Sequence, residues 1–129
     1  MRAMLAVFVG GLVGTAVRYA AERVDPAAAS GWPWATFIVN LVGATILGAL
    51  VGWLAVSGPD VGVRQRVRLF VGVGFCGSLT TYSAFALESD RLLAGTHRAL
   101  GLSYVVATVV AGVGCAAAGF IGARRVATR

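Results

Sequence analysis

The chain has 129 residues, of which 58% are hydrophobic and 12% are charged, and its mean hydropathy is +0.83. Soluble domains carry about one-quarter charged residues, so this composition excludes an ordinary soluble protein and points to the membrane. The net charge is +6, but all 11 cations are arginines near segment ends without a basic aromatic face, which argues against nucleic acid. Residues 1–129 suffice for one domain, too small to enclose a large pore alone, so we expect oligomerisation.

Few residues could carry enzyme or metal chemistry. Cys76 and Cys115 both lie in apolar segments, unlike the cysteines of a disulfide framework. His97 is the only histidine, so a metal site of His and Cys ligands has almost no support. No nucleophile and base form a catalytic pattern, and we therefore expect no enzymatic activity.

The first apolar segment covers about residues 3–21 and is either a membrane helix or a signal peptide. Gly10, Gly11 and Gly14 form a face of small residues on which another helix can pack, which favours a retained helix. Arg18 then lies one turn inside the membrane edge. It is either an anchor that reaches the interface or a cation at the mouth of an anion path, and its position does not separate the two.

The second segment, residues 35–56, has no charged residue. Trp32 and Trp34 precede it and Trp53 lies near its far end, as in the aromatic belts of membrane interfaces. Its exception is Asn40, about a turn and a half inside, which is costly in lipid unless it is hydrogen-bonded. Asn40 either joins two helices or faces a polar path.

The third segment, residues 67–93, predicts a helix that is broken at mid-membrane. Its central stretch reads GVGFCGSLTTYSAFALE over residues 72–88, and no charge occurs from 69 to 87. Glycines weaken a helix, and hydroxyl side chains offer its backbone other partners. Non-helical backbone at this depth is tolerated where protein or a water-filled path surrounds it. The alternative is a seam of small residues between packed helices.

The fourth segment covers about residues 99–123. Its Tyr104 and Thr108 are four residues apart and therefore share one helix face. Between the third and fourth segments, Glu88 either marks the return to water or lines a vestibule.

Arginines set the expected topology, because cytoplasmic loops of membrane proteins are enriched in Arg and Lys. Four spans place both chain ends on one side. That side has seven arginines and the other has three, so we predict cytoplasmic N- and C-termini. The seven are Arg2, Arg64, Arg66, Arg68, Arg124, Arg125 and Arg129, and the three are Arg23, Arg91 and Arg98.

The polar residues of the four segments are rich in hydrogen-bond donors. They include one guanidinium, one amide, several hydroxyls and aromatic rings with electropositive edges, whereas no carboxylate lies inside the membrane unless Glu88 is deeper than its position indicates. Such a lining suits a small anion that loses its water. A proton-coupled exporter would need an intramembrane carboxylate. The set comprises Arg18, Asn40, residues 77–83, Phe85, Tyr104 and Thr108.

The sequence resembles the Fluc/CrcB family of fluoride channels over nearly its whole length. The resemblance rests on Gly14 to Arg18 in the first segment, WPWATFIVNLVG in the second and GFCGSLTTYSAF in the third. It implies an all-α membrane protein with four transmembrane helices, the third broken, and an antiparallel dual-topology dimer with two pores. It also implies passive fluoride efflux across a bacterial-type cell membrane, which reduces fluoride toxicity.

The resemblance assigns roles to individual residues. A structural sodium ion at the dimer centre would be held by the backbone carbonyls of Gly77 and Thr80 from each subunit, and its charge would favour a nearby anion. The vestibule would contain Arg18, with Glu88 as a further candidate. The fluoride pore would be lined by Asn40, Thr81, Tyr82, Ser83, Phe85, Tyr104 and Thr108.

Three departures from the family pattern affect the pore. Tyr82 stands where the family has phenylalanine, Ala84 where it usually has threonine, and Gly112 offers no hydroxyl. Together with the arginine bias, they favour a heterodimer with an oppositely oriented paralogue over a homodimer. The alternatives are a non-conducting partner subunit and a small dual-topology drug exporter. The exporter would need a glutamate inside the first segment, which has only Arg18.

Overall fold

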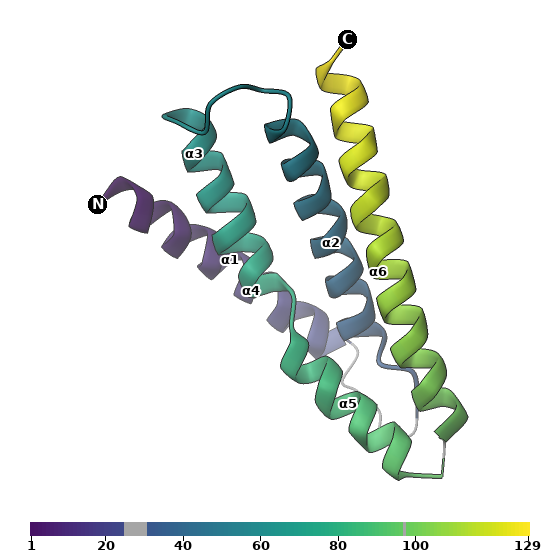
Figure 1. The fold of residues 1–129 in the computed structure, drawn as a ribbon. Coiled ribbons are helices and arrows are strands. Elements are labelled where there is room, and N and C mark those ends of the chain that lie inside the picture. The colour runs from purple at the N-terminus through teal and green to yellow at the C-terminus, as the bar shows by residue number, and fades with distance from the viewer. Residues whose placement is uncertain (25–30, 97) are drawn as a thin grey trace.

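The computed structural model describes residues 1–24, 31–96 and 98–129, and within these ranges the chain is helical and has no strand. The chain has four long helical passages. They alternate in direction, with both chain ends toward the same end of the bundle (Figure 1). Helices α3, η1, α4 and α5 together form the third passage. The elements are α1 (Arg2–Val24), α2 (Trp34–Leu54), α3 (Val63–Val67), the π-helix η1 (Arg68–Cys76), α4 (Gly77–Leu79), α5 (Tyr82–Ala94) and α6 (Arg98–Ala127).

All four passages are long and apolar enough to cross a bilayer, which makes this a multi-pass membrane protein. The first and fourth continue as helix beyond residues 21 and 123, because long arginine side chains at their ends reach water without ending the helix. The second ends at Leu54, two residues before the expected bound. The third begins at Val63, four residues before the expected bound.

Glycines bring α1 against the first half of the third passage. A methyl group on Gly10 would overlap the carbonyl oxygen of Phe70, and one on Gly14 would overlap that of Phe75. Gly74 is equally close to the backbone of α1, at Val7. In lipid the hydrophobic effect does not drive helices together. Small residues allow their backbones to approach, and van der Waals packing then stabilises the pair.

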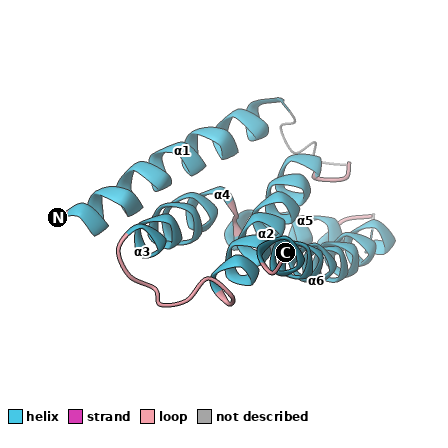
Figure 2. Cartoon of the chain, turned by 90° about the horizontal axis from the view of Figure 1, so that it is seen from above, coloured by secondary structure: helices cyan, strands magenta, loops and turns pink. Residues whose placement is uncertain are grey.

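A second glycine seam joins α2 to α6, which lie side by side in both views (Figures 1 and 2). Gly48 and Gly52 of α2 contact the carbonyl groups of Ala116 and Phe120, and Gly119 of α6 contacts that of Thr45. The bundle is thus built from two tightly packed helix pairs. The broken third passage leads from the α1 pair to the side of α6.

The break in the third passage lies between α4 and α5 and confirms the prediction from sequence. Thr80 (φ −77°, ψ 152°) and Thr81 (φ −143°, ψ 116°) are extended, a conformation that suits β-branched residues. The Thr81 hydroxyl accepts a hydrogen bond from the Ala84 N–H at 3.2 Å and so caps α5. The preceding π-helix is a form often found at functional sites. Two helix ends therefore meet inside the membrane span.

Candidate functional site

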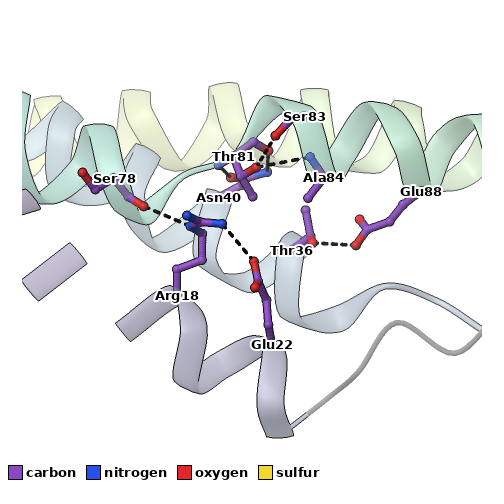
Figure 3. Close-up of polar contacts among 9 residues, drawn as sticks. All are labelled: Arg18, Glu22, Thr36, Asn40, Ser78, Thr81, Ser83, Ala84 and Glu88. Carbon is purple, nitrogen blue, oxygen red and sulfur yellow. Dashed lines mark hydrogen bonds and ion pairs between the residues drawn. The ribbon is translucent and has the colours of Figure 1, made fainter. Parts of the chain in front are cut away.

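Asn40 holds the break from the side of α2. Its Oδ1 accepts a hydrogen bond from the Thr81 N–H at 2.8 Å, and its Nδ2 donates one to the Thr81 carbonyl at 3.2 Å. The amide thus satisfies both backbone groups of a residue that is outside any helix (Figure 3). Because Thr81 is only 9% exposed, water does not replace these bonds. The sequence left open whether Asn40 joins helices or faces a polar path, and in the structure it does join them.

Arg18 holds the break from the side of α1. Its Nε donates to the Ser78 carbonyl at 3.1 Å, and its terminal nitrogen pairs with Glu22 at 3.2 Å. A cation at the C-terminal end of a helix stabilises carbonyls that lack helical donors. Figure 3 shows the guanidinium between these two partners. The side chain therefore points toward the break and is more than a surface anchor.

The break also removes the usual donors of two backbone carbonyls. In a continuous helix the Thr81 N–H would bond to the Gly77 carbonyl and the Ala84 N–H to the Thr80 carbonyl. Here the first bonds to Asn40 and the second to the Thr81 hydroxyl. Carbonyl oxygens released in this way suit a hard cation. The described parts of the chain contain no cluster of three His, Cys, Asp or Glu side chains.

A groove of about 540 Å³ lies beside the break. It is bounded by α2, by the third passage and by α6. Its walls are mostly apolar, apart from the Asn40 amide and a few hydroxyls. It gathers many of the residues singled out from sequence but not Arg18, Ser83, Glu88 or Tyr104. The predicted residues along it are Asn40, Gly77, Thr80, Thr81, Tyr82, Phe85, Thr108 and Gly112.

The aromatic side chains form a short row from the surface inward. Tyr82 is 81% exposed in this chain, and Tyr104 is fully buried. Phe85 lies between them, with ring centroids 6.1 Å from Tyr82 and 5.5 Å from Tyr104. The Tyr82 ring therefore lies at the open side of the groove.

Glu88 lies deeper than its sequence position indicated. One carboxylate oxygen accepts a hydrogen bond from the Thr36 hydroxyl at 2.7 Å, and the other accepts one from the Tyr104 hydroxyl at 2.8 Å. Both donors are buried, so Glu88 links α5 to α2 and α6 and does not simply mark the return to water. Thr36 was missed in the sequence reasoning, although it lies one turn before Asn40 on the same face of α2.

Several hydroxyl hydrogens are already used within the chain. Thr80 donates to the Cys76 carbonyl at 3.0 Å, Thr108 to the Tyr104 carbonyl at 2.7 Å, and Tyr104 to Glu88. The Thr81 and Ser83 hydroxyls share one bond of 3.2 Å, in which either can donate. Donors for an anion are therefore scarcer than the residue types suggest.

Comparisons with known proteins identify the family of the chain. The family described as "CrcB-like protein, Camphor Resistance (CrcB)" matches residues 5–120. Fluoride-specific ion channel FluC 2 of Leifsonia xyli subsp. xyli is 43% identical, over 96% of this chain and 88% of the relative. FluC 1 of Cutibacterium acnes is 42% identical, over 82% and 74%, and FluC of Caulobacter sp. (strain K31) is 38% identical, over 98% of each. The chain belongs to the CrcB family.

Proposed function

We propose that the chain is a subunit of a fluoride-specific ion channel, as its relatives are named, and not an enzyme. The observation that carries the proposal is the Asn40 amide in the groove at the break. Its Nδ2 has two hydrogens, and one is bonded to the Thr81 carbonyl. The second hydrogen remains as a donor for a small anion that sheds water in an otherwise apolar groove.

Passive flow is sufficient for the proposed physiological role. Hydrogen fluoride crosses membranes as a neutral molecule and dissociates in a less acidic cytoplasm, where the anion is trapped. A negative interior drives the anion outward by about 2.3 kcal/mol per 100 mV. The role therefore needs no nucleotide and no coupling ion.

The other residues in and beside the groove divide into those that meet the anion and those that shape its path. The ring edges of Phe85 and Tyr82 are electropositive and supply weak donors at the open side. Thr81 and Ser83 have one hydrogen to spare between them, because their two hydroxyls share one bond. Thr108 and Tyr104 have committed theirs, so we assign them to the wall of the path.

Two charged residues complete the assignment. Arg18 uses two of its five N–H groups on Ser78 and Glu22, and the others attract the anion toward the break. Glu88 repels anions, and we assign it a positioning role, since it fixes the hydroxyls of Thr36 and Tyr104.

A second subunit closes the groove in this proposal. Tyr82 and Gly77 are exposed in the single chain, as expected for residues that meet a partner. In an antiparallel dimer with two pores, the carbonyls of Gly77 and Thr80 from both subunits would hold a structural sodium ion, whose charge favours nearby anions. The loss of helical donors at these two carbonyls supports that assignment.

The arginine distribution supports a fixed orientation with cytoplasmic termini. Seven of the arginines belong to the end of the bundle where α1 begins, α3 lies and α6 ends (Figure 1). A chain with one orientation needs an oppositely oriented partner for an antiparallel dimer, and we therefore favour a paralogous subunit over a second copy.

Fluoride efflux from liposomes tests the proposal. Flux from liposomes with this protein alone would establish a homodimeric channel, and flux only with the paralogue would establish the heterodimer. Flux that requires a proton gradient and does not respond to voltage would refute the channel mechanism. No flux in either preparation would favour a non-conducting subunit, for which the replacements at Tyr82 and Gly112 offer a basis because both line the groove.

A further inference from the structure

The last turns of α6 form a small basic cavity at the membrane edge. Its volume is about 240 Å³, and the guanidinium of Arg124 stacks over the Phe120 ring at 5.4 Å from the centroid. The stacked arrangement holds the charged group beside the apolar end of the span. The cavity is lined by Phe120, Ile121, Arg124, Arg125 and Thr128.

The two arginines have no acidic partner in the described part of the chain. The ion pairs found there join Arg18 to Glu22 and Arg68 to Asp60. Thr128 donates its hydroxyl hydrogen to the Arg124 carbonyl at 3.0 Å, so the cavity's donors are the two guanidinium groups. Guanidinium forks are weakly hydrated and match the oxygens of a phosphate group.

An apolar groove leads from this cavity into the span. Phe120 and Ile121 also line a larger cavity of about 770 Å³ between α2 and α6. The far end of this cavity, at Leu47 and Val113, joins the groove at the break, whereas the part lined by Val51, Ala117 and Phe120 does not. An acyl chain in the bilayer can follow that groove, whereas a free phosphate ion cannot use it. One ligand of suitable shape has a charged head at the arginines and a hydrocarbon tail between the helices.

We propose that this surface binds one anionic phospholipid, with its phosphate-bearing head between Arg124 and Arg125 and one acyl chain in the α2–α6 groove. Each arginine near a membrane surface contributes roughly 1 kcal/mol toward anionic lipid, which corresponds to about a fivefold change in affinity. The lipid would stabilise the end of α6 and cover the seam between α2 and α6.

The test measures lipid binding to the full chain in detergent by native mass spectrometry, in titrations with phosphatidylglycerol or phosphatidylcholine. We expect tighter binding of phosphatidylglycerol and roughly 25-fold weaker binding after Arg124→Gln with Arg125→Gln. Arg129→Gln removes one arginine outside the cavity and should change the affinity less than about twofold, whereas Arg124→Gln alone removes one inside it and should weaken binding about fivefold. Ala117→Phe narrows the apolar groove and should also weaken binding, whereas Ala118→Phe, outside that groove, should not.

Four outcomes would overturn the proposal. Equal affinity of the unchanged protein for the two lipids would show that the site does not recognise an anionic head group. An equal loss of affinity in Arg129→Gln and in Arg124→Gln would show that binding depends on net charge and not on the cavity. Displacement of phosphatidylglycerol by inorganic phosphate would show that a free anion is the ligand. A double variant that loses its dimer and keeps its lipid would assign this surface to a second copy of the chain.

Discussion

Replacement of Asn40 tests fold and conduction together, because one amide serves both. Asn40→Ala removes the bonds of 2.8 and 3.2 Å to Thr81 and leaves a buried N–H and a buried carbonyl without partners. Each orphaned group costs about 1–3 kcal/mol, so we expect the free energy of unfolding to fall by roughly 2–6 kcal/mol. Fluoride flux should fall to the background of empty liposomes.

Asn40→Asp separates the two roles. The aspartate keeps an acceptor for the Thr81 N–H and loses the donor, so we expect a smaller loss of stability than in Asn40→Ala. Its added negative charge should still abolish flux through repulsion of the anion.

The assays are equilibrium unfolding in mixed detergent micelles and fluoride-electrode measurements of liposome efflux. Thr45→Ala is the matched control, because its hydroxyl donates only to Leu41 in its own helix and is exposed. It should change stability by less than about 0.5 kcal/mol and leave flux intact. Wild-type flux in Asn40→Ala would refute the role of the amide in conduction, and unchanged stability would refute its role at the break.

Three further predictions concern helix packing and the polar contacts of the third passage. Gly14→Ala should destabilise the protein by about 1–3 kcal/mol, because the added methyl group meets the backbone of η1. Gly122→Ala should not destabilise it, because Gly122 has open space around it. Thermal unfolding of the two variants measures the difference. Glu88→Gln and Tyr104→Phe should show a coupling energy of about 1–2 kcal/mol in a double-mutant cycle of unfolding, and simple additivity would contradict the bond between them. Arg18→Lys should reduce fluoride flux less than Arg18→Ala, because an ammonium group retains the charge but not the fork that joins Ser78 and Glu22; equal flux in both variants would contradict this.

The sequence predicted the membrane class and the position of the broken passage. Both follow from composition, because glycines and hydroxyls in an uncharged stretch weaken a helix wherever they fold. Asn40 was found for the same reason, since an amide inside lipid requires a partner. Local chemistry was sufficient for these features.

The direction of hydrogen bonds could not be predicted in this way. Glu88 looked like the end of a span because its partners, Thr36 and Tyr104, lie on two other helices and are joined to it only by the tertiary fold. Arg18 remained ambiguous for the same reason, until its contact with the Ser78 carbonyl placed it at the break. Tyr104 and Thr108 were expected as donors, yet the fold turns their hydrogens toward a carboxylate and a carbonyl.

The glycine seam between α2 and α6 has a consequence for biogenesis. Gly52 leaves the ribosome well before Gly119, and at about 5–20 residues per second the wait lasts roughly 3–14 s. During this time the glycine face of α2 lacks its partner helix α6, and lipid or the insertion machinery must cover it. A variant that delays or weakens insertion of the last helix would therefore expose the second helix to membrane quality control, even though the mutation lies far from it in the sequence.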